Sequence, residues 1–404
     1  MGSSTLSLPA PQSARFLKLA AGAAVGMLLL IPVAIAIHAG VYDSAVDNPL
    51  MGWGMWGAFV IYLSLRPGRA RLAATVGIGL ALRLLYDLAV GERGYWGSAV
   101  IGMGVFLGVA CVLVLAAQSL GPASEFRGAS RRALLVIGLI SYMGVFLAFY
   151  ITFAKLVLPS KLDYFLYNFD GTLGLQASFA VARFVQGRPA LERAMYLVYD
   201  CLGFWFPLVY AVHARHRLRY PVSLVKLLIL NAAIGFSLYF LFPAMGPRYA
   251  FQAFPKLPGA VTIAPAFLSG VPNAMPSLHF ATALLMYWMA GPWKWLSRIT
   301  GLFLVLTALA TLGLGEHYLI DLVVAVPYSL AIFALSSKTP ESRRALLAGA
   351  AMVLVWIAFL RIGHYHFVAG WVGVLATLAI SLTLKRKLAA SAFQAGPQRA
   401  ATSA

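Results

Sequence analysis

Charged residues are scarce in this chain. Only 11% of its 404 residues are Asp, Glu, Lys or Arg, whereas soluble domains carry about 25%. Hydrophobic residues make up 61%, and the mean hydropathy is +0.84. So little polar surface cannot cover a globule that faces water. The composition therefore excludes a soluble protein and predicts an integral membrane protein whose solvent is lipid.

Acidic residues are the scarcer part of the charge, with 12 Asp and Glu against 31 Lys and Arg. In a soluble protein the resulting charge of +19 would suggest a nucleic-acid partner. Here most basic residues lie in short connections between apolar runs, where they fix orientation and meet anionic headgroups. We therefore expect no nucleic-acid partner.

Cysteine and cofactor motifs are also nearly lacking. The two cysteines, Cys111 and Cys201, both lie inside apolar runs, and they imply no disulfide framework. There is no Gly-rich phosphate loop followed by Lys and Ser or Thr. We expect neither a cofactor nor a metal, and the sequence does not indicate an oligomeric state.

Apolar runs are what the chain has in abundance. A spanning helix needs about 20 apolar residues, and by that rule we predict an all-α, polytopic fold of about twelve transmembrane helices. The predicted spans lie near Leu19–His38, Pro49–Leu65, Leu72–Val90, Ala99–Ser119, Ala133–Leu158, Ala194–Val212, Val222–Phe242, Pro276–Trp293, Ile299–Leu314, Tyr318–Leu335, Ala345–Leu360 and Phe367–Leu384.

Basic residues gather in every second connection between these spans. Examples are Arg66–Arg71, Arg127–Arg132, Arg215–Arg219 and the tail Lys385–Lys387. The positive-inside rule places these connections and both termini in the cytoplasm. The intervening connections then face the periplasm or an equivalent lumen. The long outer connection, Pro159–Arg193, mixes apolar, aromatic and charged residues, and we predict that it is partly helical and interfacial.

Two of the outer residues suggest a nucleophile. His317 and Asp321 are four residues apart, so on a helix they share a face and can touch. A carboxylate beside an imidazole fixes its tautomer and raises the basicity of the far nitrogen, which could then attack phosphorus. The alternative is an interfacial pair that only satisfies its own charges.

A second outer histidine suggests a proton donor at an anion site. His279 follows Ser277 at the start of a predicted span, where free amides and the helix dipole attract anions. Ser277 can cap that helix, and a histidine on the first turn can protonate a leaving oxygen. Arg248, in the same outer connection, suits phosphate because its planar fork binds two oxygens. The alternatives are a capped helix with an interfacial histidine, and an arginine that snorkels to headgroups.

At these residues the sequence resembles the phosphatidic acid phosphatase type 2 superfamily, and most of all its branch of inositol phosphorylceramide synthases and related lipid phosphotransferases. The motifs that carry the resemblance are Pro276-Ser-Leu-His279 and His317-Tyr-Leu-Ile-Asp321. It implies a six-helix catalytic core at 133–336, preceded by a four-helix extension at 1–132 and followed by a two-helix extension and tail at 337–404.

The resemblance also implies roles for these residues. His317 would be the nucleophile that forms a phosphohistidine, Asp321 would orient it, and His279 would be the general acid. Ser277 and its neighbouring amides would hold phosphate oxygens. Arg248 substitutes for a basic motif of the family by position only, and we expect Arg248 and Tyr249 to contact the substrate as well.

Two acids of the long outer connection remain open. Asp163 and Asp170 resemble acids that precede the core in synthase-like members, and they could read an acceptor headgroup. The alternative is that they act as helix caps or in surface pairs.

The sequence departs from the family pattern at two places. The Lys-x6-Arg-Pro motif is absent from the expected loop, where Gly246-Pro-Arg248 stands instead. Thr311 occupies the position of an arginine found six residues before the histidine in the phosphatase branch. Losing two phosphate-binding cations weakens a simple phosphatase interpretation and is compatible with the synthase-like branch.

We therefore expect a lipid phosphotransferase or phosphatase in the bacterial inner membrane, with a lipid phosphate as substrate, a periplasmic active site, and water or a headgroup alcohol as acceptor. The alternative is a polytopic transporter or flippase without phosphoryl chemistry, which would predict internal repeats that we do not find. A zinc enzyme with His279, His317 and Asp321 as ligands would have the cation Arg248 beside its metal, which opposes that interpretation.

Overall fold

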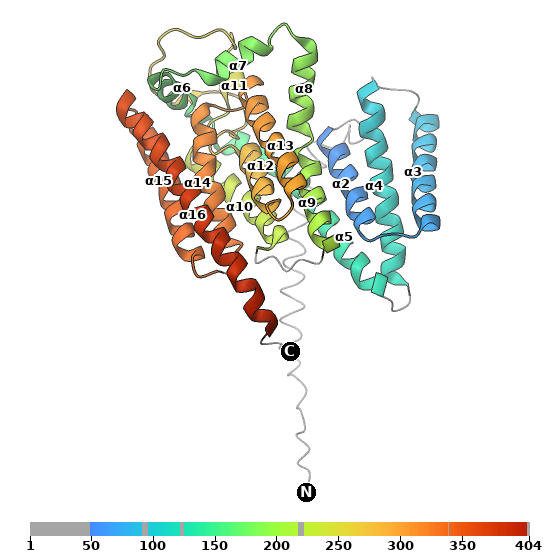
Figure 1. The fold of residues 1–404 in the computed structure, drawn as a ribbon. Helices are drawn as coiled ribbons and strands as arrows, with labels where there is room; N and C mark the ends of the chain where they lie inside the picture. Colours follow the sequence, from blue (N-terminus) through green and yellow to red (C-terminus); the bar gives the residue numbers. More distant parts are fainter. Residues whose placement is uncertain (1–48, 91–95, 122–124, 217–221, 338, 402–404) are drawn as a thin grey trace, which may run out of the picture.

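The computed structural model describes residues 49–90, 96–121, 125–216, 222–337 and 339–401 (Figure 1). The secondary structure within them consists of helices, joined by loops, and one antiparallel pair of two-residue strands, β1 (Ser160–Lys161) and β2 (Ala266–Phe267). The predicted all-α class is confirmed. The predicted first span, Leu19–His38, lies outside the described residues.

The helices follow the predicted apolar runs closely. The N-terminal part contains α2 (Pro49–Ser64), α3 (Arg69–Val90), α4 (Trp96–Leu120) and α5 (Glu125–Val157). The long outer connection is partly helical, as predicted, with α6 (Asp163–Thr172) and α7 (Ala177–Val185). The rest comprises α8 (Pro189–Asp200), α9 (Leu202–His216), α10 (Leu224–Leu241), α11 (Pro247–Ala250), α12 (Leu278–Met289), α13 (Lys294–Gly313), α14 (Leu319–Leu335), α15 (Ser342–Ile362) and α16 (Phe367–Ala401).

The predicted count of about twelve spans is not confirmed. In the described part of the chain, six helices are long and apolar enough to cross a membrane, or seven if α8 and α9, which meet at 49°, form one bent span. The helices α2, α12 and α14 have only 16, 12 and 17 residues. In α12 the cause is local, because Gly291 and Pro292 follow its end and proline cannot continue a helix.

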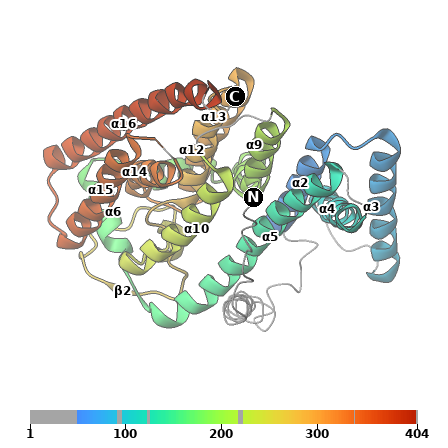
Figure 2. The same cartoon turned by 90° about the horizontal axis from the view of Figure 1, so that it is seen from below.

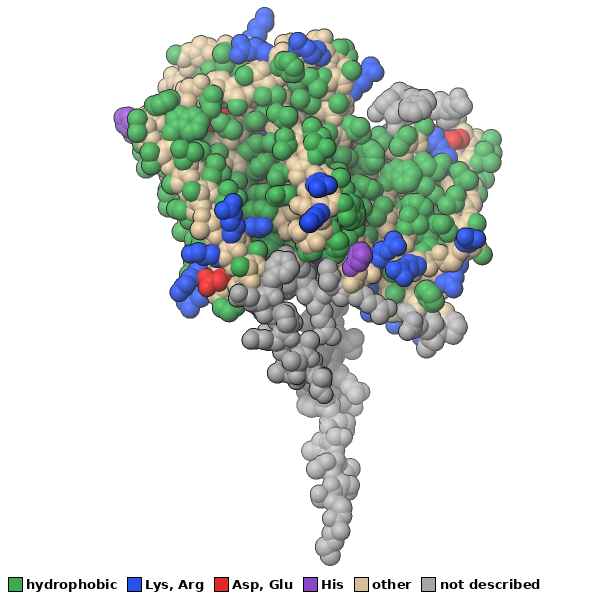
Figure 3. All heavy atoms as spheres, viewed as in Figure 1, with side chains coloured by type: hydrophobic (Ala, Val, Ile, Leu, Met, Phe, Trp, Pro, Cys, Tyr) green, Lys and Arg blue, Asp and Glu red, His purple; other side chains and the backbone are tan. Residues whose placement is uncertain are grey.

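The surface of the bundle is apolar over much of its height. Large hydrophobic side chains are exposed on several helices, for example Leu88 at 75%, Val355 at 65% and Val368 at 71%. Figure 3 shows green hydrophobic side chains as a broad band, with blue basic residues mainly below and above it. Such a band matches a hydrocarbon environment, so the chain is an integral membrane protein.

The helices pack in one continuous bundle. The C-terminal helices α15 and α16 both pack against α14, while α2 packs against α4 and α9. Figure 2 shows α15 and α16 along one edge and α2, α3 and α4 at the opposite edge. The larger hydrophobic cluster includes Ile61 of α2 and Leu388 of α16. Because buried residues from all three parts share this cluster, the division at residues 132 and 336 stays a prediction.

The active-site candidates are placed at one end of this bundle. The helices α10, α12, α13 and α14 run up and down its centre, so that α12 and α14 begin at the same, upper end (Figure 1). The connection between α5 and α8 folds back over this end as α6 and α7. The predicted motifs at the starts of α12 and α14 therefore lie at the same end.

The N-terminal helices are held together by a close glycine contact. A Cβ atom at Gly104 of α4 would lie 2.4 Å from Cδ1 of Trp56 and 2.6 Å from the carbonyl oxygen of Gly52, both on α2. Small residues at such crossings let membrane helices approach closely, which increases van der Waals contact.

We predict that Gly104→Ala lowers stability by about 1–3 kcal/mol, because the added methyl group must push the two helices apart. Gly54→Ala on α2 is the matched control, since its Cβ would meet no atom within 4 Å. Thermal unfolding in detergent measures both variants. Equal midpoints for the two would contradict the prediction.

Candidate active site

His317 lies just before α14 and is 1% exposed. The prediction that His317 and Asp321 share a helix face is therefore wrong in detail, because only Asp321 is on the helix. They still approach each other, with 3.5 Å between Nδ1 of His317 and Oδ2 of Asp321. The hydroxyl of Ser178 on α7 donates a hydrogen bond of 2.6 Å to the carbonyl oxygen of His317.

A backbone carbonyl sets the orientation of the His317 ring. Nδ1 lies 2.9 Å from the carbonyl oxygen of Ala274, which is closer than Asp321. Since a carbonyl oxygen only accepts, we assign the proton to Nδ1. The lone pair of Nε2 is then the free one. Burial lowers the pKa of His317 to about 4, so its ring is neutral at pH 7.

Asp321 joins the starts of the two central helices. Its Oδ2 accepts a hydrogen bond of 2.7 Å from the backbone N–H of Tyr318, in a capping box at the start of α14. Its main-chain oxygen accepts a hydrogen bond of 3.2 Å from the N–H of Ser277, which precedes α12. Among the described residues, Oδ1 of Asp321 has no hydrogen-bond partner. Asp321 thus connects the starts of α12 and α14 through hydrogen bonds, and it also lies next to His317.

His279 lies on the first turn of α12, as predicted, and is partly exposed. Its ring stacks on Tyr199 of α8, with 3.8 Å between ring centroids and an interplanar angle of 18°. The ring centroids of His279 and His317 are 6.5 Å apart. Ser277 is the N-cap of α12, and its hydroxyl oxygen accepts a hydrogen bond of 3.3 Å from the N–H of Phe280. No pattern in the sequence indicated Tyr199, which precedes His279 by 80 residues and lies on another helix.

Arg248 and Tyr249 stand on the short helix α11 beside this site. The guanidinium of Arg248 donates a hydrogen bond to the hydroxyl of Tyr196. The backbone N–H of Arg248 donates a hydrogen bond of 2.9 Å to the carbonyl oxygen of Gly315. The hydroxyl of Tyr249 donates 2.8 Å to Oε1 of Glu316, the residue before His317. Burial raises the pKa of Glu316. Neither Tyr196 nor Glu316 was predicted.

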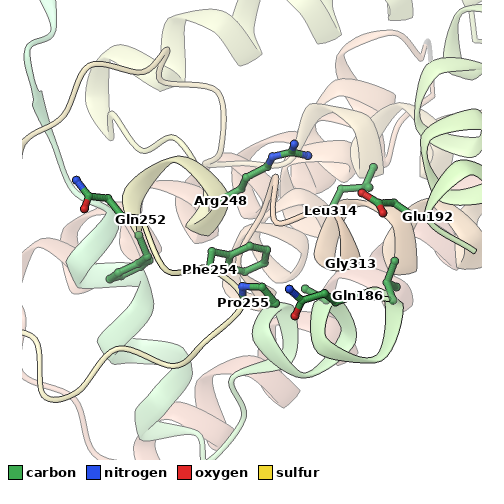
Figure 4. Close-up of a pocket in the computed structure, with 11 residues that line it drawn as sticks. Gln186, Glu192, Arg248, Gln252, Phe254, Pro255, Gly313 and Leu314 are labelled. Atoms are coloured by element: carbon green, nitrogen blue, oxygen red, sulfur yellow. The ribbon is translucent and has the colours of Figure 1, made fainter. Parts of the chain in front are cut away.

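Arg248 also borders a cavity of about 220 Å³. Figure 4 shows Arg248 on one side of this cavity, with Glu192 and Gln186 on the other. The ring of Phe254 forms part of its wall. The cavity therefore combines a cation, a carboxylate, an amide and an aromatic face.

Asp163 and Asp170 of α6 are buried, at 0% and 1% exposure. The carboxylate of Asp163 accepts from the N–H groups of Met245 and Gly246, at 3.1 and 2.9 Å, and from the hydroxyl of Tyr318, at 3.0 Å. Burial raises its pKa to about 7, against these hydrogen bonds, which favour the ionised form.

Asp170 caps the start of α14 from outside that helix. Its carboxylate oxygens accept hydrogen bonds of 2.7 Å from the N–H of Leu319 and 3.2 Å from the N–H of Ile320. Burial raises its pKa well above the usual range. Both acids contact the protein's own backbone, and Asp163 also contacts the hydroxyl of Tyr318, which favours the structural alternative over contact with a headgroup.

The two outer loops touch at Gly246. This residue has a φ of +98°, and a Cβ there would lie 2.3 Å from the carbonyl oxygen of Glu316. Only glycine fits such a contact. It brings the loop of Arg248 against the loop of His317.

Comparison with known families places these residues in a recognised segment. Residues 164–335 match the model of the PAP2 superfamily. The match includes His279, His317 and Asp321 and falls inside the predicted core of 133–336. It does not distinguish the synthase-like branch from other members. No curated protein and no solved structure matches the chain.

The PAP2 segment, residues 164–335, therefore suggests a phosphatase-type membrane enzyme with a lipid phosphate as substrate. Among the described residues, no three His, Cys, Asp or Glu side chains are grouped so that they could hold a metal ion.

We predict that Asp170→Ala destabilises the PAP2 segment, because two buried N–H groups at the start of α14 lose their acceptor. Each unpaired group costs about 1–3 kcal/mol. Asp170→Asn retains an acceptor oxygen and should lose less. Asp87→Ala is the control, since Asp87 pairs with Arg83 at a partly exposed position, where such pairs contribute about 0–1 kcal/mol. If Asp170→Ala unfolds at the same temperature as Asp87→Ala, this interpretation of Asp170 is wrong.

Proposed function

We propose that this chain is a membrane phosphotransferase that forms a phosphohistidine on His317 from a lipid phosphate. The observation that carries the proposal is the hydrogen bond from Nδ1 of His317 to the carbonyl oxygen of Ala274, at 2.9 Å. It leaves the lone pair of Nε2 free in a neutral ring beside the start of α12. A neutral imidazole with a fixed tautomer is the form that can attack phosphorus.

The reaction has two steps. In the first, Nε2 of His317 attacks phosphorus, the bond from phosphorus to the leaving oxygen breaks, and His279 gives that oxygen a proton. In the second, His279 takes a proton from the acceptor hydroxyl, whose oxygen attacks the phosphohistidine. The N–P bond then breaks, and its electron pair returns to His317. The separation of 6.5 Å between the ring centroids leaves room for a phosphoryl group between them.

Three features supply charge stabilisation. The first-turn amides and the dipole of α12 point at the phosphate position beside His279. The hydroxyl of Ser277 can donate to a phosphate oxygen while its lone pairs serve Phe280. Arg248 adds a cation held by Tyr196. The stacked ring of Tyr199 holds the ring of His279 in place.

We further propose that the acceptor is a headgroup hydroxyl, as in the synthase-like branch. The cavity beside Arg248 supports this, because the amide of Gln186 and the carboxylate of Glu192 can hydrogen-bond hydroxyl groups. Its volume of about 220 Å³ suits a small polar headgroup. Water as acceptor would make the enzyme a phosphatase.

The orientation is also a proposal. With the basic connections in the cytoplasm, both termini are cytoplasmic and the active site faces the periplasm of a bacterial inner membrane. The lipid phosphate then comes from the outer leaflet.

We predict that His317→Ala abolishes labelling of the protein by lipid substrates that carry radioactive phosphate, because the nucleophile is gone. His279→Ala should slow labelling by about 10²–10⁴-fold, the usual contribution of a general acid. His364→Ala, at an exposed histidine in the loop after α15, is the control. A panel of lipid phosphates, with and without alcohols, reveals donor and acceptor. Equal labelling of wild type and His317→Ala would contradict the proposal and favour a transporter.

We predict that the labelling rate, plotted against pH, falls on the acid side near pH 4 and not near the ordinary histidine pKa of about 6.5. The sign follows from burial, which lowers the pKa of His317 to about 4. The ring therefore stays neutral and reactive as pH falls, until its folded pKa is reached. The titration of the donor phosphate is measured separately by phosphorus NMR. An acid limb at pH 6 or above that is not due to the donor would refute the assignment.

A further inference from the structure

A second cavity lies at the end of the molecule opposite to the candidate active site. Its volume is about 1000 Å³. It is lined by the end of α2, the first turns of α5 and the end of α9. Figure 1 shows these parts at the lower end, away from the starts of α12 and α14. Phosphoryl transfer at His317 makes no use of it.

Three arginines from three different elements line this cavity. They are Arg66 after α2, Arg132 of α5 and Arg215 of α9. No acidic residue is among the described residues that line it. In the part of the chain that the structure describes, none of the three forms an ion pair with a carboxylate. Three like charges around one space repel each other, and a bound anion would relieve this repulsion.

The walls between the arginines leave room for a ligand. Ala129 and Ala133 on α5, and Tyr210 and Ala214 on α9, are pairs four residues apart that each share one helix face. Alanine at three of these four positions keeps the space open. Tyr210 and Ser64 line the same space, and the hydroxyl of Tyr210 can donate a hydrogen bond to an anion oxygen.

Arg66 occupies an unusual backbone position. It has a φ of +54° and is the only residue other than glycine with positive φ among the described residues. It follows the last turn of α2, where glycine is the favoured residue. An arginine there strains the backbone, while it adds a third guanidinium to the cavity.

The positive-inside rule alone would scatter basic residues over this end of the bundle. Arg69 at the start of α3 is such a residue: it is exposed, as Arg66, Arg132 and Arg215 also are, but it lies outside the cavity. Arg66, Arg132 and Arg215 differ because separate elements bring them to one space. Convergence of guanidinium groups is the arrangement that recognises phosphate oxygens.

We propose that this cavity is a second binding site, which takes a phosphate-bearing anion through Arg66, Arg132 and Arg215. The volume of about 1000 Å³ exceeds that of one phosphate, so the anion can carry a further group. The phosphate can belong to an anionic lipid headgroup of the nearer leaflet or to a free phosphate compound. This site goes beyond the proposed function and does not depend on His317.

The test uses the full-length protein in nanodiscs and has two arms. In the first, discs of zwitterionic lipid are titrated with pyrophosphate by calorimetry. In the second, native mass spectrometry measures retention of phosphatidic acid or phosphatidylglycerol mixed into the discs. Binding in the first arm alone identifies a free phosphate compound, and binding in the second alone identifies a lipid headgroup. Binding in neither arm overturns the proposal.

The variants are Arg132→Gln and Arg215→Gln, with Arg69→Gln as the matched control. Each cavity variant should weaken binding by about tenfold or more, the loss expected for one charge-assisted hydrogen bond. The control should bind as wild type does. An equal loss in Arg69→Gln overturns the proposal, because it would show general surface attraction.

Two further variants complete the design. Arg132→Lys keeps the charge and should retain more binding than Arg132→Gln, so the comparison holds even if one variant folds poorly. His317→Ala should bind the same anion as wild type. Loss of binding in His317→Ala would place the anion at the active site and overturn the proposal, whatever its effect on labelling.

Discussion

The pairing of two buried carboxylates with backbone amides is the interaction on which the candidate site depends. Asp170 takes two N–H groups at the start of α14, and Asp163 takes two more from the Met245–Gly246 turn together with the hydroxyl of Tyr318. The first amides of a helix have no partner within it, and in a buried setting they must find one. Because both acids stand on the single helix α6, they hold the Met245–Gly246 turn and the start of α14, which follows His317, against the same helix.

The sequence allowed much of this arrangement to be predicted, and the physical reasons differ from part to part. Apolar runs located the helices, and the cap at Ser277 and the proximity of His317 to Asp321 followed from local motifs. The membrane-spanning helices were harder to count from the sequence, because Gly291 and Pro292 end α12 early and α8 meets α9 at a bend. The Ala274 carbonyl could not be predicted, since a backbone atom has no side-chain signal. Tyr199 and the partners of Asp163 depend on contacts between distant segments.

The distribution of cations separates the two ends of the molecule. At the upper end Arg248 is the cation that lines the smaller cavity, and the dipole and the N-cap Ser277 of α12 lie at the same end. A site with little fixed positive charge depends on its geometry, which the tight loop contact at Gly246 provides. At the lower end several arginines gather without neighbouring acids. The two ends are thus suited to different anions, one that reacts and one that only binds.

The shortness of α12 has a consequence for the substrate. Helices α12 and α13 meet at the same turn near Trp293, but α12 has 12 residues and α13 has 20. At about 1.5 Å per residue, α12 is about 12 Å shorter than its neighbour. The chain after α13 turns back, so that the N–H of His317 donates to the carbonyl oxygen of Thr311 in the last turn of α13, and His317 reaches the start of the shorter helix. Under the proposed function, the phosphate of the lipid must reach a histidine that is only 1% exposed. The number of water molecules that accompany the phosphate then influences whether water or an alcohol is the acceptor.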